Sequence, residues 1–246
     1  MKKYIEGVGE VEAPKTFKER LKNFWYHYKW HSVVSLILVF ALTVCMLQFC
    51  KKEEYDVHIL YAGPYVIGKT VTESGEAEIE TAISSFKRVV DDFNSDKKIK
   101  INLSNYLYMS AEESEAAGPN VDYSFLNNDK KSLEGALEFS EYYLCFISPS
   151  VYEAYKGSGE GGSLFINLEE FASYVSPDAF YAPNAIKLSS TGFYNLPGIS
   201  SLPEDTLICI KMPSAIAAKS KEHQKHLSNA KEILKNILII TNNPLE

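Results

Sequence analysis

The chain has 246 residues, of which 46% are hydrophobic and 23% charged, and its formal net charge is −7 at pH 7. This composition excludes a disordered chain and a polytopic membrane protein, and the length suits one globular domain with a small appendage. Residues 1–31 hold seven Lys or Arg and four Glu, about +3 in total, so the rest of the chain carries about −10. Because an acidic body lacks the clustered positive charge of a nucleic-acid surface, we expect no nucleic-acid partner.

The first predicted element is a helix over residues 14–30. Pro14 suits a first helical turn, and large apolar residues recur on one face between Phe17 and Tyr28, with basic residues on the other faces. This pattern is typical of an interfacial helix in contact with anionic membrane lipid. A binding site for a cytoplasmic protein explains the same basic segment, residues 1–31, equally well.

An apolar run follows. Residues 30–50 contain no charged side chain, and as a helix they would span about 31 Å, the hydrocarbon thickness of a bilayer. The run is longer than the apolar core of a cleaved signal peptide, and no small-residue cleavage site follows it. A buried core helix rarely stays apolar on every face over this length. We therefore predict an uncleaved transmembrane helix over residues 32–50.

The basic residues around this run predict its orientation. Residues 12–31 contain five Lys or Arg, and residues 51–70 contain three. Segments rich in Lys and Arg stay on the cytoplasmic side. The count predicts a single-pass protein of the cell membrane, with a cytoplasmic N-terminus and an extracellular domain over residues 51–246.

Strand and helix patterns alternate along residues 51–246. This alternation predicts an α/β domain of three layers with a mainly parallel sheet. The polar residues 109–130 predict a loop or weak helix. Short apolar runs predict strands over residues 57–62, 100–107, 142–147 and 207–212, and apolar positions spaced by three or four predict helices over residues 76–94, 132–139, 149–156 and 221–240.

Open α/β sheets bind ligands at the carboxyl ends of their strands. The residues expected at that edge, and therefore the candidate ligand-binding residues, are Gly63, Tyr65, Tyr106, Ser148 and Ser150. The two serines begin a predicted helix, whose free N–H groups can hold a carboxylate or a phosphate. Capping of this helix by Ser148 is the simpler interpretation of the same Ser-Pro-Ser sequence.

No catalytic or metal-binding motif stands out in the sequence. His223 and His226 are three residues apart on the last predicted helix without an acidic or cysteine partner at a motif distance, so we interpret them as part of a solvated face. We expect no metal, no cofactor and no enzymatic activity. Cys145 and Cys209 each lie in an apolar strand, and both a disulfide and two buried free thiols are open interpretations.

Three segments resemble extracellular solute-binding proteins of the periplasmic type II class. They are YDVHILYAGPY at 55–65, FISPSVYEAY at 146–155 and LFINLEEF at 164–171. The anchor with its WYHYKW approach is also similar to the start of small membrane-anchored proteins of Gram-positive bacteria. The resemblance implies a non-catalytic, bacterial binding module for a small molecule or peptide, in a body shorter than two full lobes. The alternative is a structural or assembly protein of the cell envelope that acts through a protein partner.

Overall fold

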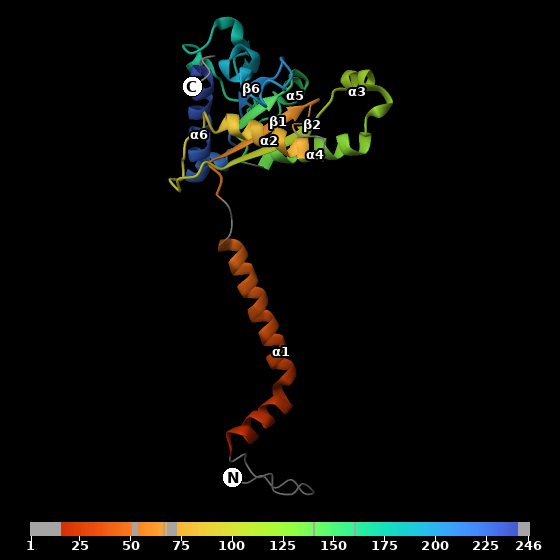
Figure 1. Ribbon diagram of the computed structural model, residues 1–246, viewed down its shortest axis with the longest axis vertical. Helices are drawn as coiled ribbons and strands as arrows, with labels where there is room; N and C mark the ends of the chain where they lie inside the picture. Colours follow the sequence, from red (N-terminus) through yellow and green to blue (C-terminus); the bar gives the residue numbers. More distant parts are fainter. Residues whose placement is uncertain are drawn as a thin grey trace. The chain divides into compact units, whose positions relative to one another are not determined.

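The computed structural model describes residues 16–50, 54–65, 67, 73–139, 141–159 and 161–240. They belong to two compact units, which divide after Glu53. The first unit contains one helix, α1 (Phe17–Cys50), which joins the predicted approach helix and the apolar run without a break (Figure 1). Its segment Phe24–Leu47 is long and apolar enough to cross a membrane, and the apolar window within it is 0% buried. Helix α1 is therefore a candidate membrane anchor or signal sequence, and Pro14 lies outside the described residues.

The second unit is an α/β domain. Its six strands are β1 (Val57–Gly63), β2 (Ile101–Leu107), β3 (Leu144–Ile147), β4 (Phe180–Ala182), β5 (Ala185–Lys187) and β6 (Leu207–Ile210). Its α-helices are α2 (Glu73–Phe86), α3 (Ala111–Ala117), α4 (Tyr123–Phe139), α5 (Pro149–Tyr155) and α6 (Lys221–Ile239). All four predicted strands and all four predicted helices are present, although several have other bounds. Strands β4 and β5 were not predicted, and helix α3 lies in the segment that was predicted as a loop or weak helix.

The strands form one sheet in the order β2-β1-β3-β6-β5-β4. Strand β1 is parallel to β2 and β3, whereas the pairs β3–β6, β6–β5 and β5–β4 are antiparallel. The prediction of a mainly parallel sheet is therefore wrong, because the sheet is mixed. Parallel neighbours need a crossover connection, usually a helix. Helices connect β1, β2 and β3, but β4, β5 and β6 follow one another through a tight hairpin and short 3-10 turns, which reverse the strand direction.

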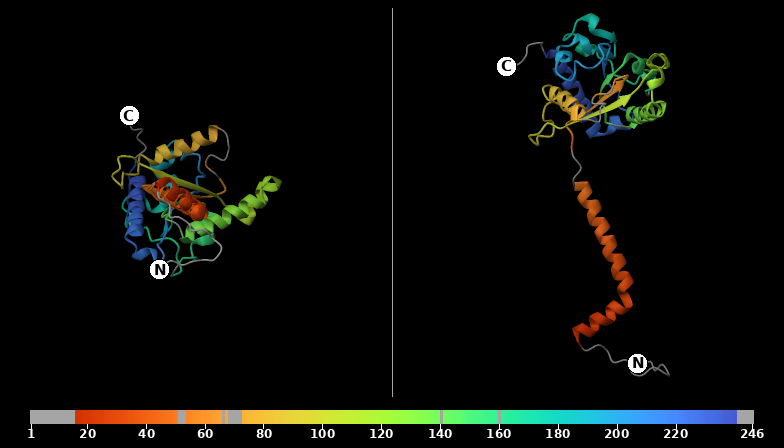
Figure 2. Two further views of the ribbon diagram at one scale, coloured as in Figure 1. Left: turned by 90° about the horizontal axis from the view of Figure 1, so that it is seen from below. Right: turned by 45° about the vertical axis from the view of Figure 1, so that its right-hand side comes forward.

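Helices cover both faces of this sheet. Helices α2 and α6 lie on one face, and α4 and α5 lie on the other (Figure 1 and the right-hand view of Figure 2). Each fully buried Leu, Ile or Phe contributes about 1.5–3 kcal/mol through removal of apolar surface from water. The first face buries Ile59, Phe146 and Ile208 against Phe86 and Ile233, and the second buries Leu60, Cys145 and Leu207 against Leu133 and Val151.

Helix α2 ends at Phe86, earlier than the apolar spacing predicts, although Val89 and Val90 are still buried in the core. The buried Asp56 accounts for the difference. Its carboxylate accepts hydrogen bonds from the backbone N–H groups of Phe93 (3.0 Å), Asn94 (3.1 Å) and Lys100 (2.9 Å). Side chains that bond backbone N–H groups compete with helical hydrogen bonding. Asp56 therefore holds this segment in a loop between α2 and β2.

The polar segment that was predicted as a loop or weak helix contains α3 and the first turns of α4. Ser110 and Glu113 form a capping box at the start of α3, in which each side chain accepts a backbone N–H of the other residue. Asp122 accepts N–H groups of residues 124 and 125 at the start of α4. Caps rather than apolar spacing therefore define these two helix starts.

Cys145 and Cys209 lie opposite each other on β3 and β6, and both thiols are free and buried. Lys211 donates its N–H to the carbonyl of Tyr143, and hydrogen-bonded pairs recur at every second residue of an antiparallel ladder, so the cysteines also form a hydrogen-bonded pair. The Cα atoms of such a pair are about 5.5 Å apart, a distance that a disulfide can span. Of the two interpretations left open by the sequence, the structure has the free thiols.

Candidate functional site

Gly63 and Ser148 lie together at the carboxyl ends of β1 and β3. The Ser148 N–H donates to the carbonyl of Ala62 at 2.9 Å. A Cβ atom placed on Gly63 would be 3.3 Å from the Ser148 Cβ and 2.8 Å from the Tyr61 hydroxyl, so this position has no room for a side chain. The structure thus brings three of the five predicted ligand-binding residues together, because Ser148 also contacts Ser150.

The two predicted serines are occupied by contacts within the protein. Ser148 caps α5, because its Oγ accepts the Val151 N–H at 3.3 Å, and this Oγ is also 2.8 Å from the Ser150 Oγ. Ser150 donates to Glu113 Oε1 at 3.3 Å. A carboxylate beside this helix start repels an anionic ligand, so the observed contacts favour capping over anion binding.

The two predicted tyrosines point to other partners. The Tyr65 hydroxyl donates to Glu78 of α2. Tyr106 lies on β2 beside Ala62, and its hydroxyl interacts with that of Tyr142 in the segment before β3. Burial, followed by the interaction with Tyr142, raises the pKa of Tyr106 to about 12. The hydroxyl of Tyr106 is therefore turned away from Ser148 and toward the segment that precedes β3.

A cavity of about 780 Å³ lies elsewhere, between α4, the loop after α5, the end of β6 and the start of α6. This volume is within the range of small-molecule pockets. None of the five predicted residues is among the described residues that line it. The lining is Glu134, Leu137, Glu138, Phe139, Tyr143, Tyr155, Ser158, Gly159, Ser163, Leu164, Lys211, Met212, Pro213, Ser214, Ile216, Ala217, Ser220 and His223.

Lys211 is the buried basic residue of this cavity and is only 4% exposed. Its backbone continues β6, because it forms a bridge with Phe165 and donates its N–H to Tyr143. Its Nζ donates to the carbonyl of Ala136 at 3.3 Å and lies 5.6 Å from the centre of the Tyr143 ring. Burial lowers the pKa of Lys211, and Cys145 opposes this shift. The ammonium group is thus held in a position with little solvent.

Tyr143 and His223 form a polar pair on another wall of the cavity. The Tyr143 hydroxyl lies 2.8 Å from His223 Nδ1, and the two rings meet edge to face. Burial, followed by Glu141, raises the pKa of Tyr143. The interpretation of His223 and His226 as part of a solvated face is therefore wrong, since both are half-buried and His226 lies 3.8 Å from Glu141.

Two carboxylates complete the polar lining. Glu134 and Glu138 belong to α4, and the Tyr155 hydroxyl donates to Glu134 Oε1 at 3.3 Å. Burial, followed by Glu134, raises the pKa of Tyr155. The cavity therefore presents one buried ammonium group and two carboxylates, the set of charges that complements a zwitterion. Exposed apolar side chains, Phe139 and Ile216, also line it.

The comparisons with known proteins give no further constraint. No protein-family model, curated protein or solved structure matches the chain. The resemblance to solute-binding proteins therefore stays a prediction.

Proposed function

We propose that this chain is a membrane-anchored, non-catalytic binding module that captures a small zwitterionic ligand or a short peptide outside the cytoplasm. The observation that carries the proposal is the cavity of about 780 Å³, in which the buried Lys211 shares the lining with Glu134 and Glu138. A ligand carboxylate would pair with Lys211, and a ligand ammonium group with either glutamate. Charge-assisted hydrogen bonds of this kind are about twice as strong as neutral ones.

The proposed location rests on α1 and on the charge around it. Helix α1 is long and apolar enough to act as the anchor, and more Lys and Arg precede the apolar run than follow it. This bias favours an N-terminus in the cytoplasm and an α/β domain outside the cell. The lipid of the membrane is then the permanent partner of α1.

The strand edge with Gly63, Tyr65, Tyr106, Ser148 and Ser150 is the competing position for a ligand. The contacts of Ser148 and Ser150 with α5 and Glu113 favour the cavity over this edge. Substitutions at Lys211 and Ser148 therefore distinguish the two positions.

A thermal-shift screen of the purified full-length chain in detergent tests the proposal. Amino acids, dipeptides and tripeptides are the probes. A ligand at 100 times its Kd adds about 2.7 kcal/mol of stability, which raises the Tm of a domain of this size by roughly 5–10 °C. We expect Lys211→Met to abolish the shift and Ser148→Ala to retain it. Loss of the shift in Ser148→Ala alone would place the ligand at the strand edge.

The alternative function, an assembly protein of the cell envelope, is favoured by one observation. Phe139 is 80% exposed and Ile216 is 85% exposed, and both line the same cavity. Exposed apolar patches often mark protein interfaces. The absence of any shift across all probes would contradict the binding module and favour a protein partner at Phe139 and Ile216.

A further inference from the structure

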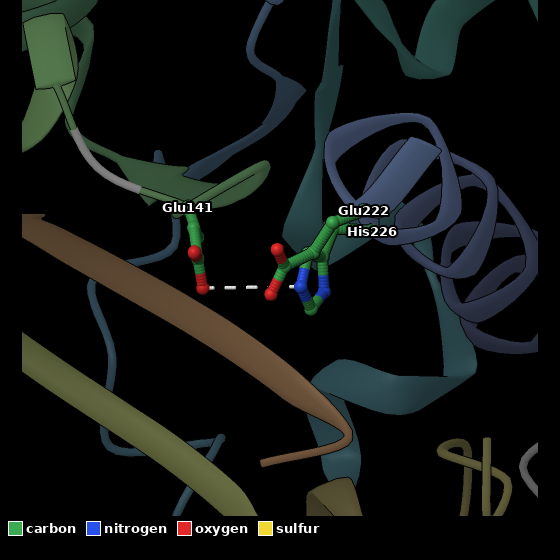
Figure 3. Close-up of side chains that lie close together, drawn as sticks. All are labelled: Glu141, Glu222 and His226. Atoms are coloured by element: carbon green, nitrogen blue, oxygen red, sulfur yellow. Dashed lines mark ion pairs between the residues drawn. The ribbon is translucent and has the colours of Figure 1, made fainter. Parts of the chain in front are cut away.

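A second cluster of chemically active side chains lies at the opposite edge of the sheet from the predicted ligand edge. Glu141 precedes β3, and Glu222 and His226 belong to α6. Their ligand atoms all lie within 4.8 Å of one another. Figure 3 shows the two α6 side chains directed toward Glu141. Glu222 and His226 are four residues apart, which places them on one face of the helix.

His58 extends this cluster from β1. Its Nε2 lies 3.5 Å from Glu141 Oε2, and the Nε2 of His226 lies 3.8 Å from the same oxygen. The side chains of His58 and His226 are 18% and 16% exposed, and with Glu141 they line one narrow crevice. Two imidazoles and two carboxylates, contributed by β1, the segment before β3 and α6, therefore gather around Glu141.

We propose that His58, Glu141, Glu222 and His226 bind one zinc ion, which fixes α6 to this edge of the sheet. Two nitrogen and two carboxylate ligands suit Zn²⁺, whereas Mg²⁺ and Ca²⁺ prefer oxygen ligands alone. Four protein ligands make a closed, structural site, without the open position of a catalytic zinc. None of these four residues lines the proposed ligand cavity, although Tyr143 lines both that cavity and the crevice.

Glu141 already lies near both histidines, and binding of the ion would draw the rings of His58 and His226, whose centres are 6.0 Å apart, toward each other. Tetrahedral zinc with bonds of about 2.0–2.1 Å holds its ligand atoms about 3.3 Å apart. The separations of 3.5 Å and 3.8 Å at Glu141 are close to this value, and 4.8 Å is the upper bound within the group Glu141, Glu222 and His226. Glu222 is exposed, and its flexible side chain can close the remaining gap.

Asn102 on β2 is the positioning residue for His58. Its side-chain amide lies 2.9 Å from His58 Nδ1. When Nε2 binds zinc, Nδ1 carries the proton and donates it to the amide oxygen of Asn102 after the amide turns by 180°. Such outer partners fix the tautomer of a histidine ligand, and their loss weakens metal binding by about 10–100-fold.

Zinc titration of the full-length chain in detergent, after removal of metal with a chelator, tests the proposal. A chromogenic chelator reports zinc affinity by competition, and we expect one saturable zinc per chain. His226→Gln and Glu141→Gln should each weaken binding at least tenfold, and Asn102→Leu about tenfold. His223→Gln is the matched control, because it lies on the same helix but contacts Tyr143, and it should keep the parent affinity.

Two further measurements distinguish a loss of zinc binding from a loss of folding. Circular dichroism of each metal-free variant identifies any variant that is unfolded, and Co²⁺ bound in place of zinc should give the intense absorption of a tetrahedral site without a thiolate band. Failure to bind zinc one to one would overturn the proposal. So would equal zinc affinity in His226→Gln and the parent, or equal weakening in His226→Gln and His223→Gln.

Discussion

Lys211 shows how strand register determines the environment of a single side chain. It follows β6, which is buried along its whole length, and its backbone pairs with Phe165 and Tyr143. This pairing carries a long basic side chain into the protein, where Nζ donates to the carbonyl of Ala136 and lies over the face of the Tyr143 ring. Burial of an ammonium group opposes folding unless a partner compensates for the lost water.

Replacement of Lys211 by methionine should stabilise the domain at pH 7 by an amount on the order of 1 kcal/mol, because it removes a desolvated charge and keeps the apolar stem. Burial lowers the pKa of Lys211 from its ordinary value of 10.5. The unfolded chain therefore binds more protons between the folded pKa and 10.5, and the stability of the parent rises with pH through that window. The difference between variant and parent should shrink as the pH approaches 10.5.

Urea unfolding of both proteins in detergent at several pH values measures this difference. Lys225→Met, at an exposed position of α6, is the matched control and should change stability by less than about 0.5 kcal/mol. Burial raises the pKa of the Cys145 thiol to about 12, so above pH 9 the contribution of this thiol to stability falls in parent and variant alike and cancels in their difference. A Lys211→Met protein that is less stable at pH 7, or a difference that does not depend on pH, would contradict the argument.

At the scale of elements, the spacing of apolar residues predicted the long helices of the α/β domain. It did not predict where all of them begin and end, because side-chain hydrogen bonds to the backbone contribute there. Apolar spacing was sufficient for α6 because one face of it is buried over its whole second half. The same spacing placed the end of α2 too late, because Val89 and Val90 remain buried after the helix stops. The segment after the helix is bonded to Asp56, which is more than thirty residues away in the sequence.

Asp56→Ala should lower the free energy of unfolding by about 3 kcal/mol. The substitution leaves three backbone N–H groups without their charged acceptor, and the loss of hydrogen bonds to a buried charge is among the larger effects of single substitutions. Chemical denaturation of the full-length chain measures the change. Asp91→Ala, at an exposed position in the same loop, is the control, and equal losses in both variants would show that the three bonds contribute little.

The mixed sheet and most of the candidate site could not be predicted, for related reasons. Strands β4 and β5 have three residues each, which is too few to show the alternating pattern of a strand. They form an antiparallel hairpin that belongs to the antiparallel half of the sheet. The cap at Ser148 was predictable because Ser-Pro is a local signal. Lys211, Tyr143 and His223 come together only through the pairing of β3 with β6 and the packing of α6, and no local spacing encodes that contact.

At the scale of the whole molecule, the acidic charge and the hydrophobic core belong to the same unit. Both buried clusters consist of residues between Val57 and Leu238, and no residue of α1 is a member of either. The side chains described in α1 are mostly exposed, and α1 is a candidate membrane anchor or signal sequence. The α/β unit therefore contains the apolar contacts needed for its own stability.

A fragment of residues 54–246 should therefore fold without α1. We expect a soluble protein that unfolds cooperatively, with a Tm within a few degrees of the α/β domain in the full-length chain, since none of its core is removed.

The control is a fragment of residues 54–220. It lacks α6, whose Ile233, Leu234 and Ile237 are fully buried, and each such loss costs about 2–5 kcal/mol even as a truncation to alanine. This shorter fragment should be unfolded by circular dichroism, because the three losses sum to about 6–15 kcal/mol, as much as the roughly 5–15 kcal/mol that stabilise a typical domain. A longer fragment that precipitates or unfolds without cooperativity would show that α1 contributes to the fold as well as to the location of the domain.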